Sequence, residues 1–344
     1  MTKENSRDAS FADAAHGRSA NFAYPLISEV PGGDFAGVSV SGIRKQAGTI
    51  DLLNGVSFDV PPGECFGILG ENGSGKTTLL RVITGLAFPS AGTVTISGHD
   101  PHADPVGALG NMSALIGIPA FYPYLGAYDN LRLFWRENCP PDRARIMAAL
   151  EVVGLANESG KKVGAFSRGM LQRLGVALVV MQDRPLAVFD EPTQGVDVVW
   201  VEKLAGIFRE MAAKGKALLI TSHDFDFITG LCGNILILDK GIPAYRGSLN
   251  EIVEFPYYFH LRVTPLEKAA EVLKRLGYVH KAIRLGDSFE LTMKDSMVSA
   301  LIAALVDAGC EVHECACRRY SISDLIAQRR ASGPSGGAEP PYAI

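Results

Sequence analysis

The sequence Gly70-Glu-Asn-Gly-Ser-Gly-Lys-Thr-Thr78 follows one apolar run, Cys65–Leu69, and precedes a second, Leu79–Ile83. Its spacing matches the phosphate-binding pattern G-x-x-x-x-G-K-[ST], and the two runs predict a buried strand before the loop and a helix after it. The backbone N–H groups of such a loop, together with the positive end of the helix, surround a phosphate chain. A glycine-rich turn that binds no ligand would not require a strand and a helix in this order.

All nine residues of this loop are predicted to bind nucleotide. Lys76 supplies an ammonium group for the β- and γ-phosphates of ATP, and Thr77 supplies a hydroxyl group for Mg²⁺. The other residues assigned to nucleotide binding are Gly70, Glu71, Asn72, Gly73, Ser74, Gly75 and Thr78.

The composition is that of an ordinary globular protein, with 47% hydrophobic and 20% charged residues in a chain of 344. This length is sufficient for one large α/β domain and a smaller one. The net charge of −4 creates no broad positive field, so we expect no nucleic-acid partner. We find no apolar run long enough to span a membrane and no charged leader, which predicts a cytoplasmic location.

The order of the patterns predicts an α/β fold: a P-loop NTPase core with an antiparallel β subdomain and a helical insert, followed by a small α+β C-terminal domain. In the C-terminal part, residues 258–317 read β-α-β-α-β. We expect a disordered N-terminal extension at residues 1–35 and a disordered tail at 331–344. The predicted units between them are residues 36–250 for the nucleotide-binding ATPase domain, about 105–182 for its helical subdomain, and 255–330 for the accessory domain.

The run Leu186-Ala-Val-Phe-Asp190-Glu191 places two carboxylates at the end of a predicted buried strand. Asp190 would hold Mg²⁺ through water, and Glu191 would act as the general base that polarises the attacking water. His223 ends the next apolar strand, where it can stabilise the γ-phosphate. Without the loop upstream, an acidic turn and a structural histidine would explain the same residues.

The run Phe166-Ser-Arg-Gly-Met-Leu-Gln-Arg-Leu174 distinguishes between the protein classes that share a phosphate-binding loop. A serine and a glycine amide at a helix N-terminus make a second anion site. As an ordinary N-cap, Ser167 would leave the Gly-Met-x-Gln-Arg run unexplained. The run resembles the signature of ABC transporter ATP-binding subunits, in the variant found in the multidrug- and antibiotic-export (ABC-2 type) branch with a separate permease. The resemblance implies a head-to-tail dimer, in which the ATP of the partner subunit is contacted by Ser167, Arg168, Gly169 and Met170.

The resemblance covers roughly residues 36–250 and continues in the same order through Asp190, Glu191 and His223. It implies that Asp197 is the D-loop aspartate, which links the two nucleotide sites of the dimer. The C-terminal part resembles the small domain appended to antibiotic- and multidrug-export ATPases, with residues 321–325 near the place of their terminal motif.

Two positions depart from the family pattern. The aromatic residue that stacks on adenine falls near Ala47, and no aromatic residue occurs between Phe35 and Phe58. Because the loss of base stacking weakens binding by about 1 to 3 kcal/mol, we expect poor discrimination of ATP from GTP. The Q-loop residue that contacts Mg²⁺ falls on Gly117, so that either another group completes the coordination or hydrolysis is weakened. In that case Gly117→Gln should raise turnover.

The resemblance implies an ATPase, with ATP and Mg²⁺ as its ligands, that drives a separately encoded multi-span permease in export. The ATPase subunits would form a homodimer or a heterodimer, peripheral on the cytoplasmic face of the membrane. Pro119–Leu125 is a candidate docking surface for the permease, although its rings can equally pack inside the helical insert. Two alternatives stay open: a degenerate regulatory subunit that binds nucleotide with little hydrolysis, and a soluble ABC ATPase that acts on ribosomes or DNA.

The six cysteines of a cytosolic chain are expected to be free thiols. Cys310, His313, Cys315 and Cys317 are candidate zinc ligands. In an extended segment, however, His313, Cys315 and Cys317 lie on one face about 6.5 to 7 Å apart, which is too far for one tetrahedral zinc ion without a bulge. The pattern therefore favours a structural strand over a metal site.

Overall fold

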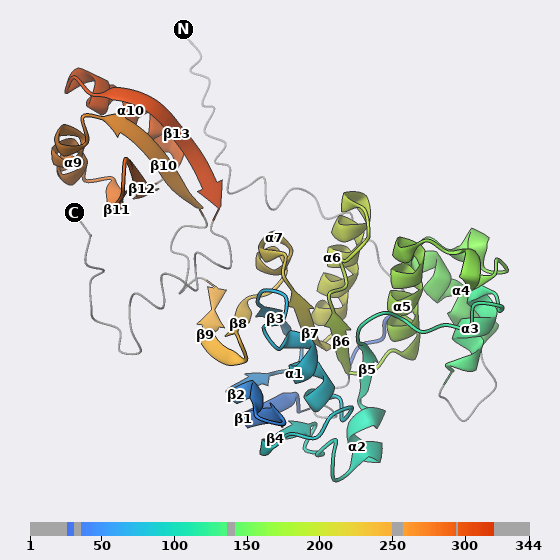
Figure 1. Cartoon of the computed structure of the whole chain (residues 1–344). Helices are drawn as coiled ribbons and strands as arrows, with labels where there is room; N and C mark the ends of the chain where they lie inside the picture. Colours follow the sequence, from blue (N-terminus) through green and yellow to red (C-terminus); the bar gives the residue numbers. More distant parts are fainter. Residues whose placement is uncertain (1–25, 31–35, 136–141, 250–256, 294, 320–344) are drawn as a thin grey trace, which may run out of the picture.

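A six-stranded sheet lies at the centre of the nucleotide-binding part of the chain (Figure 1). Neighbouring strands run parallel except at the β8–β9 edge. Strands β3, β6 and β7 are buried at every position, as expected for apolar strands that are covered on both faces. In spatial order the strands are β5 (Met112–Leu115), β6 (Leu186–Asp190), β7 (Ala217–Ser222), β3 (Cys65–Leu69), β8 (Asn234–Asp239) and β9 (Ile242–Ser248).

The computed structural model describes residues 26–30, 36–135, 142–249, 257–293 and 295–319. Residues 321–325, which the sequence analysis compared with a C-terminal motif, lie outside these ranges.

A three-stranded antiparallel sheet packs on one side of the central sheet. Its order is β2 (Ile50–Val60), β1 (Val38–Ala47) and β4 (Ala91–Ile96). Buried side chains of all three strands share one hydrophobic cluster with β3 and α1 (Lys76–Ile83), and the ring of Phe58 stacks on Phe66 with centroids 4.8 Å apart. The predicted class, an α/β core with an antiparallel subdomain and helices, is confirmed.

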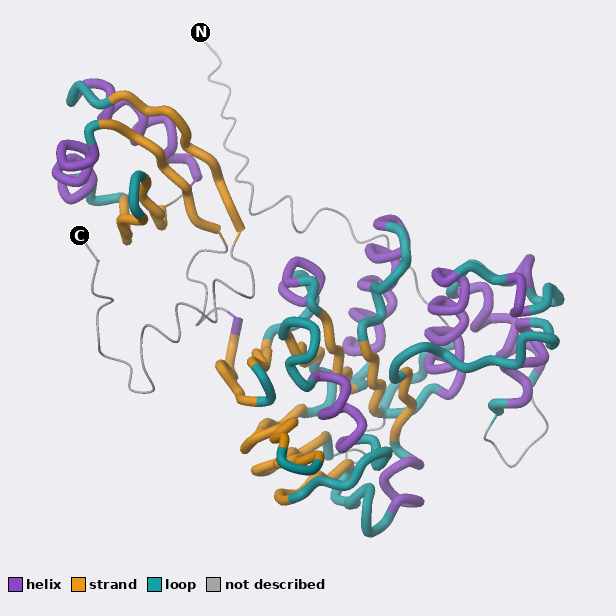
Figure 2. The backbone as a smooth tube through the Cα atoms, in the orientation of Figure 1, coloured by secondary structure: helices purple, strands orange, loops and turns teal. Residues whose placement is uncertain are grey.

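Three helices form a separate group beside β5 and β6, on the right in Figure 2. They are α3 (Ala127–Leu133), α4 (Arg143–Val152) and α5 (Arg168–Gln182), and they lie in the region predicted to be a helical insert. Strand β5 also lies in that region but belongs to the central sheet, because four residues are too few to show a strand period and pairing with β6 determines their conformation. The remaining helices of this part are α2 (Pro105–Gly110), α6 (Val198–Ala213), α7 (Phe225–Thr229), η2 (Ala156–Glu158) and η3 (Val163–Ala165).

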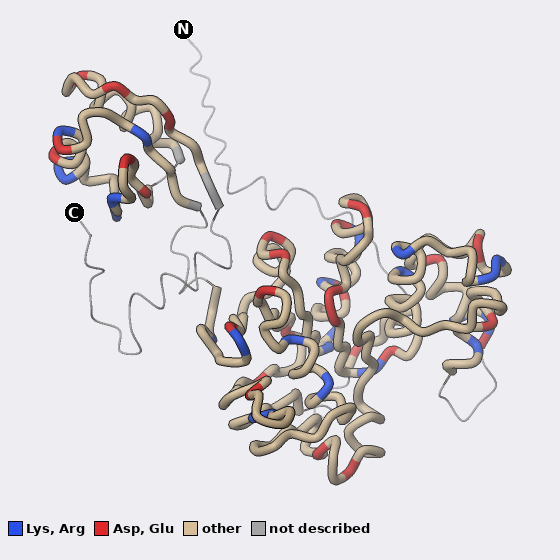
Figure 3. The backbone as a smooth tube through the Cα atoms, in the orientation of Figure 1, with Lys and Arg blue, Asp and Glu red and all other residues tan. Residues whose placement is uncertain are grey.

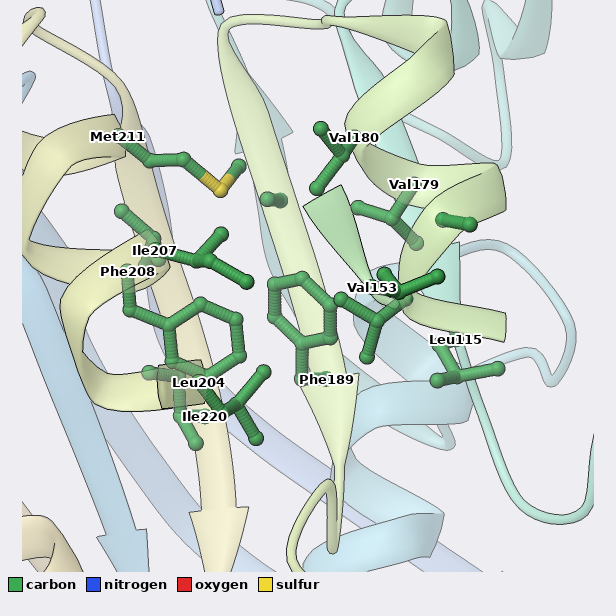
Figure 4. Packing of buried hydrophobic residues seen from close by; sticks show 14 of the residues in the cluster. Leu115, Val153, Val179, Val180, Phe189, Leu204, Ile207, Phe208, Met211 and Ile220 are labelled. Carbon is green, nitrogen blue, oxygen red and sulfur yellow. The ribbon is translucent and has the colours of Figure 1, made fainter. Parts of the chain in front are cut away.

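Phe189 on β6 is enclosed by hydrophobic side chains from both of its neighbouring helices (Figure 4). On one side its ring lies 4.4 Å from that of Phe208 on α6, centroid to centroid. On the other side Val179 and Val180 of α5 complete the enclosure. Because Phe189 immediately precedes Asp190, this packing fixes the end of β6 from which the two carboxylates emerge.

The N-terminal segment differs from the prediction at residues 26–30. These residues fall within the extension expected to be disordered, yet Leu26 and Ile27 are only 8% and 3% exposed. Both side chains belong to the hydrophobic cluster that contains α5 and α6 residues. The contact with this cluster is made by two adjacent large apolar side chains. Because the residues around them are small or polar, the sequence pattern did not indicate this contact.

The C-terminal domain is a four-stranded antiparallel sheet with two helices on one face. Its strand order, β11-β12-β10-β13, and its β-α-β-β-α-β sequence are those of a ferredoxin-like fold. The prediction omitted β11, an edge strand in which only Ala282 is buried and the apolar alternation is therefore weak. The elements are β10 (Tyr257–Thr264), α9 (Leu266–Arg275), β11 (Val279–Leu285), β12 (Ser288–Met293), η4 (Asp295–Met297), α10 (Val298–Asp307) and β13 (Glu311–Arg319).

Of the four candidate zinc ligands, His313, Cys315 and Cys317 lie on β13, as the strand interpretation predicted, and Cys310 is buried directly before it. His313 Nε2 lies 2.8 Å from the hydroxyl group of Thr264, and within the described ranges no group of three His, Cys, Asp or Glu side chains could hold a metal ion. Every cysteine in those ranges is a free thiol. Burial raises the pKa of the Cys65 thiol to about 12.

Candidate nucleotide-binding site

A cavity of about 820 Å³ brings together the loop 72–78, the carboxyl end of β6 and residues from four other segments. This is the edge at which parallel strands of an open α/β sheet place ligand-binding groups. Gly70 and Glu71 are not among the lining residues, and their carbonyl oxygens accept hydrogen bonds from Lys76. The residues that line the cavity are Ile50–Leu52, Asn72–Thr78, Gly117–Pro119, Arg168, Leu171, Gln172, Asp190, Glu191, Gln194 and Lys240.

The glycines of the loop are required by close approach and by backbone conformation. A Cβ atom on Gly70 would lie 2.3 Å from Ser74 Oγ and 2.6 Å from the Leu238 carbonyl oxygen, so no other residue fits. Gly75, the N-cap of α1, has φ of 103°, a left-handed value that favours glycine. Ser74 Oγ is buried with no hydrogen-bond partner, as expected for a polar group whose partner is a bound ligand.

Lys76 is only 6% exposed, and its ammonium group has partners on two sides. Its ammonium group donates to the Gly70 carbonyl at 2.7 Å and to the Glu71 carbonyl at 3.2 Å. It also lies 3.2 Å from Glu191 Oε1. The buried positive charge is therefore aimed along the loop toward the end of β6.

Asp190 accepts hydrogen bonds from two hydroxyl groups. Thr77 Oγ1 donates at 2.8 Å and Thr221 Oγ1 donates at 2.6 Å, to opposite oxygens of the carboxylate. Asp190 is 5% exposed. Thr77 and Asp190 thus place a hydroxyl and a carboxylate oxygen side by side, a donor set suited to a hard divalent cation.

Glu191 follows with a backbone that is held in an unusual conformation. Its φ is 48°, a value uncommon for residues other than glycine, and its N–H donates to the carbonyl and hydroxyl oxygens of Thr221, each at 3.1 Å. His223 Nδ1 lies 2.8 Å from Glu191 Oε2, while Lys76 approaches Oε1. The carboxylate therefore lies between a lysine and a histidine at the cavity wall.

The predicted signature residues begin helix α5. Ser167 is its N-cap and accepts a hydrogen bond from the Met170 N–H at 3.3 Å. A Cβ on Gly169 would lie 3.1 Å from the Gly195 carbonyl oxygen, so this position also requires a small residue. Arg168 reaches the cavity that contains the chain's own loop, whereas Ser167, Gly169 and Met170 are not among the residues that line it.

Asp197 links helix α6 to helix α5. It caps α6 by accepting from the Trp200 N–H at 2.9 Å and forms an ion pair with Arg173 of α5 at 2.8 Å. The Arg173 guanidinium lies over the Trp200 ring, 4.8 Å from its centroid. The Trp200 N–H and the Arg173 charge lower the pKa of Asp197 below its ordinary value.

The sequence patterns assigned no role to Arg173, Thr221 or Gln172. The Gln172 side chain donates a hydrogen bond to the Glu191 carbonyl oxygen at 3.4 Å. Arg173 and Gln172 fall within the signature run, so their position could have pointed to them. Thr221 gave no local signal, because its contact with Asp190 depends on the pairing of β6 with β7.

Comparison with known proteins agrees with this geometry. Residues 53–194 match the family model described as ABC transporter. The chain is 35% identical over 231 residues to YdbJ of Bacillus subtilis (strain 168), an uncharacterized ABC transporter ATP-binding protein, with 67% of this chain and 75% of that protein covered. This chain belongs to the ABC transporter ATP-binding proteins. It is thus an ATP-binding ABC ATPase.

Two further matches agree with this family. The Nod factor export ATP-binding protein I of Burkholderia orbicola (strain AU 1054) is 32% identical over 222 residues, with coverage of 64% of this chain and 73% of that protein. A solved structure, described as that of the ATP binding subunit of an ABC transporter, has a TM-score of 0.58 at 25% identity and covers 64% of this chain and 92% of that chain. No helix among residues that the structure describes is both long enough and apolar enough to cross a membrane.

The family pattern places the adenine-stacking residue near Ala47, on the β1–β2 hairpin, so the part of the cavity lined by Ile50–Leu52 of that hairpin is termed the base-side wall. Ala47 does not line the cavity. Its cross-strand partner Ile50 does so instead and is 64% exposed. None of the residues that line the cavity is aromatic. The base-side wall thus presents an aliphatic side chain and no aromatic ring.

Gly117, which the family pattern assigns to the Q-loop position, lines the cavity. Its φ is 68°, and no atom lies within 4 Å of the Cβ that another residue would add. A longer side chain therefore has room, but a residue other than glycine would strain the backbone by about 1 to 2 kcal/mol.

We expect Gly117→Gln to raise Mg²⁺-dependent ATP turnover about threefold or more, because the amide oxygen adds a ligand for the ion. It should also lower the free energy of unfolding by about 1 kcal/mol, because of the positive φ. Turnover and urea unfolding measure the two effects. Gly117→Ala is the matched control, since it has the same backbone strain without the oxygen. Equal turnover in the two variants would contradict the assignment of Gly117 to the Q-loop.

Proposed function

We propose that this chain is the ATPase subunit of an ABC exporter, in which two ATPase domains close around ATP and drive a separate membrane permease. The observation that carries the proposal is the Glu191 carboxylate, which lies 3.2 Å from the Lys76 ammonium group and 2.8 Å from His223 Nδ1. A carboxylate in this position can polarise a water that attacks the γ-phosphate. The direction of transport rests on relatives, among which is a Nod factor export protein.

Thr77 and Asp190 supply the oxygen atoms that would hold Mg²⁺. Both residues line the cavity, and their side-chain oxygens lie 2.8 Å apart. When bound, the ion neutralises charge on the β- and γ-phosphates. Lys76 binds the same phosphates, Glu191 accepts the proton of the attacking water, and His223 holds the Glu191 side chain in place.

The surface around Asp197 supports a head-to-tail dimer, whether homodimer or heterodimer. Val198 and Val199, directly after Asp197, are 76% and 78% exposed, an unusual exposure for two adjacent large apolar residues. Ser167 and Gly169 also lie off the chain's own cavity, where a second ATPase subunit could bring its nucleotide to them. In this proposal the signature and the D-loop meet the partner's ATP.

The loop after β5 supports a second interface, with the permease. Within Pro119–Leu125, Phe121 packs inward with its ring centroid 6.0 Å from that of Phe134. By contrast, Tyr122 is 45% exposed and Tyr124 is 65% exposed. We therefore assign the exposed side chains of this loop, and not Phe121, to permease contact at the cytoplasmic face of the membrane.

The division into an ATPase domain at 36–250 and an accessory domain at 255–330 is part of this proposal, as is the absence of a nucleic-acid partner. Acidic and basic residues are interspersed over the described elements rather than segregated by sign (Figure 3). Such a distribution supports protein and nucleotide partners over a broad electrostatic attraction to a polyanion.

Gly117 favours one alternative, a regulatory subunit that binds nucleotide and hydrolyses little. At this position the cavity has no side-chain oxygen, and the base-side wall has no aromatic ring. The complete set of Lys76, Asp190, Glu191 and His223 contacts supports the hydrolytic subunit instead. Turnover of the purified protein distinguishes the two.

We expect Glu191→Gln to lower ATP turnover by about 100-fold or more, because the amide cannot accept the proton of the attacking water. Nucleotide binding should persist, since Lys76 and the loop are unchanged. Mg²⁺-ATPase activity of the protein, isolated in mild detergent with co-purifying proteins identified by mass spectrometry, is the measurement. Glu271→Gln, on the exposed side of α9, is the control with the same chemical change. If wild type and Glu191→Gln both lack ATPase activity in a sample that contains a permease, the result would favour the regulatory subunit.

We expect ATP and GTP to bind with affinities within about threefold of each other, because aliphatic contact with a base face does not distinguish its edges. Ile50→Ala should weaken both about fivefold, which corresponds to the loss of about 1 kcal/mol of apolar contact. Competition against a fluorescent nucleotide measures this. Ile242→Ala removes a comparably exposed isoleucine outside the cavity and serves as the control. A strong preference for ATP would contradict this description of the base-side wall.

A further inference from the structure

The N-terminal segment Leu26–Val30 contacts residues that precede β6 and β7, toward the opposite end of β6 from Asp190. Leu26 and Ile27 are buried in the hydrophobic cluster that contains residues of α5 and α6. Val30 packs against the cluster shared with the antiparallel sheet. Five residues that precede the matched family region therefore contact both main hydrophobic clusters of the ATPase.

Polar contacts fix the same segment to the C-terminal ends of two helices. The Ser28 N–H donates to both carboxylate oxygens of Asp183, at 3.2 and 3.1 Å. The Val30 N–H donates to the Lys214 carbonyl at 2.9 Å, and the Lys214 ammonium group donates to the Ile27 carbonyl at 2.7 Å. Asp183 ends α5 and Lys214 ends α6, so the segment ties these two helix ends together.

Asp183 also joins the helical subdomain to the central sheet. Its carboxylate pairs with Lys216 at 2.8 Å and with Arg145 of α4 at 3.2 Å. Lys216, directly before β7, is 2% exposed, and it also donates to the carbonyl groups of Asp183 and Arg184. One carboxylate thus holds a buried cation of the core, a cation of the helical subdomain and the backbone of the N-terminal segment.

The contacts around Asp183 lie between α5, which carries the signature residues, and β6, which carries Asp190. Helix α5 begins after Ser167 and ends at Asp183, and β6 then runs from Leu186 to the carboxylate of Asp190. A rotation of about 10° at this joint would move the Ser167 end of the 15-residue helix by about 4 Å. The angle at Asp183 therefore determines where the signature lies relative to the catalytic carboxylates.

We propose that Leu26–Val30 and Asp183 form a clasp that fixes the angle between α5 and β6, which makes Asp183 a positioning residue for ATP hydrolysis. The proposal rests on the hydrolytic function proposed above. Neither the clasp segment nor Asp183 lines the nucleotide cavity. Loss of the clasp should therefore affect the alignment of the two half-sites and leave nucleotide binding unchanged.

Two variants of the full chain test the clasp. Asp183→Asn removes the charge but keeps a residue that tolerates the φ of 50° found here, and the double variant Leu26→Ala, Ile27→Ala loosens the segment without disturbing the ion pairs. We expect kcat to fall about 10-fold in Asp183→Asn and severalfold in the double variant, with KM for ATP changed less than about twofold. Hydrogen exchange of the α5 amides, residues 168–182, should quicken in both.

The control is the double variant Val272→Ala, Leu276→Ala, which truncates two partly buried apolar side chains in the C-terminal domain. It should leave kcat and α5 exchange unchanged, and an equal fall in kcat would show general destabilisation and overturn the clasp. Unchanged α5 exchange in both clasp variants, or faster exchange with unchanged kcat, would also overturn it. The ATP turnover of wild type, measured beside that of Glu191→Gln, separates the two proposals. If the two turnover rates are equal, the proposed hydrolytic function is wrong, and hydrogen exchange of the α5 amides alone tests the clasp.

Discussion

The hydrogen bond from Thr77 to Asp190, 2.8 Å long, joins the two segments on which the nucleotide site depends. Thr77 lies at the start of α1 after β3, and Asp190 ends β6, so this contact requires β7 to pair with both strands in register. The side chains that fill the space around Phe189 set the position of β6, and through it the position of Asp190. The chemistry at the sheet edge therefore depends on hydrophobic packing behind it.

The parts of the site that the sequence predicted are those determined by local spacing. The loop 70–78 and the pair Asp190 and Glu191 each follow an apolar run that could only be a buried strand, so their place at one sheet edge follows from the fold class. The antiparallel subdomain and most helices were predictable for the same reason. Strand β5 was not, because four residues carry too little periodicity and only its pairing with β6 determines its conformation.

Other features depend on tertiary contacts that no local pattern reveals. Thr221 meets Asp190 across a strand pair, and Ile50 replaces Ala47 at the cavity wall because the β1–β2 hairpin brings the later residue there. Leu26 and Ile27 were assigned to a disordered extension, since two apolar residues in a polar stretch are weak evidence without the surface that receives them. That surface gives α5 a fixed end at Asp183, while its other end presents Ser167.

The central claim is that two ATPase subunits, in the simplest case two copies of this chain, enclose ATP between the loop of one and Ser167 of the other. The most direct test is the mass of the Glu191→Gln protein in solution, measured by light scattering with and without Mg²⁺ and ATP. We predict a change from the 36.7 kDa of one chain to about twice that mass when ATP is added, and no change when Ser167→Arg is also present. A protein that binds ATP yet keeps the monomer mass would contradict the homodimer, and one that dimerises equally with Ser167→Arg would contradict the account.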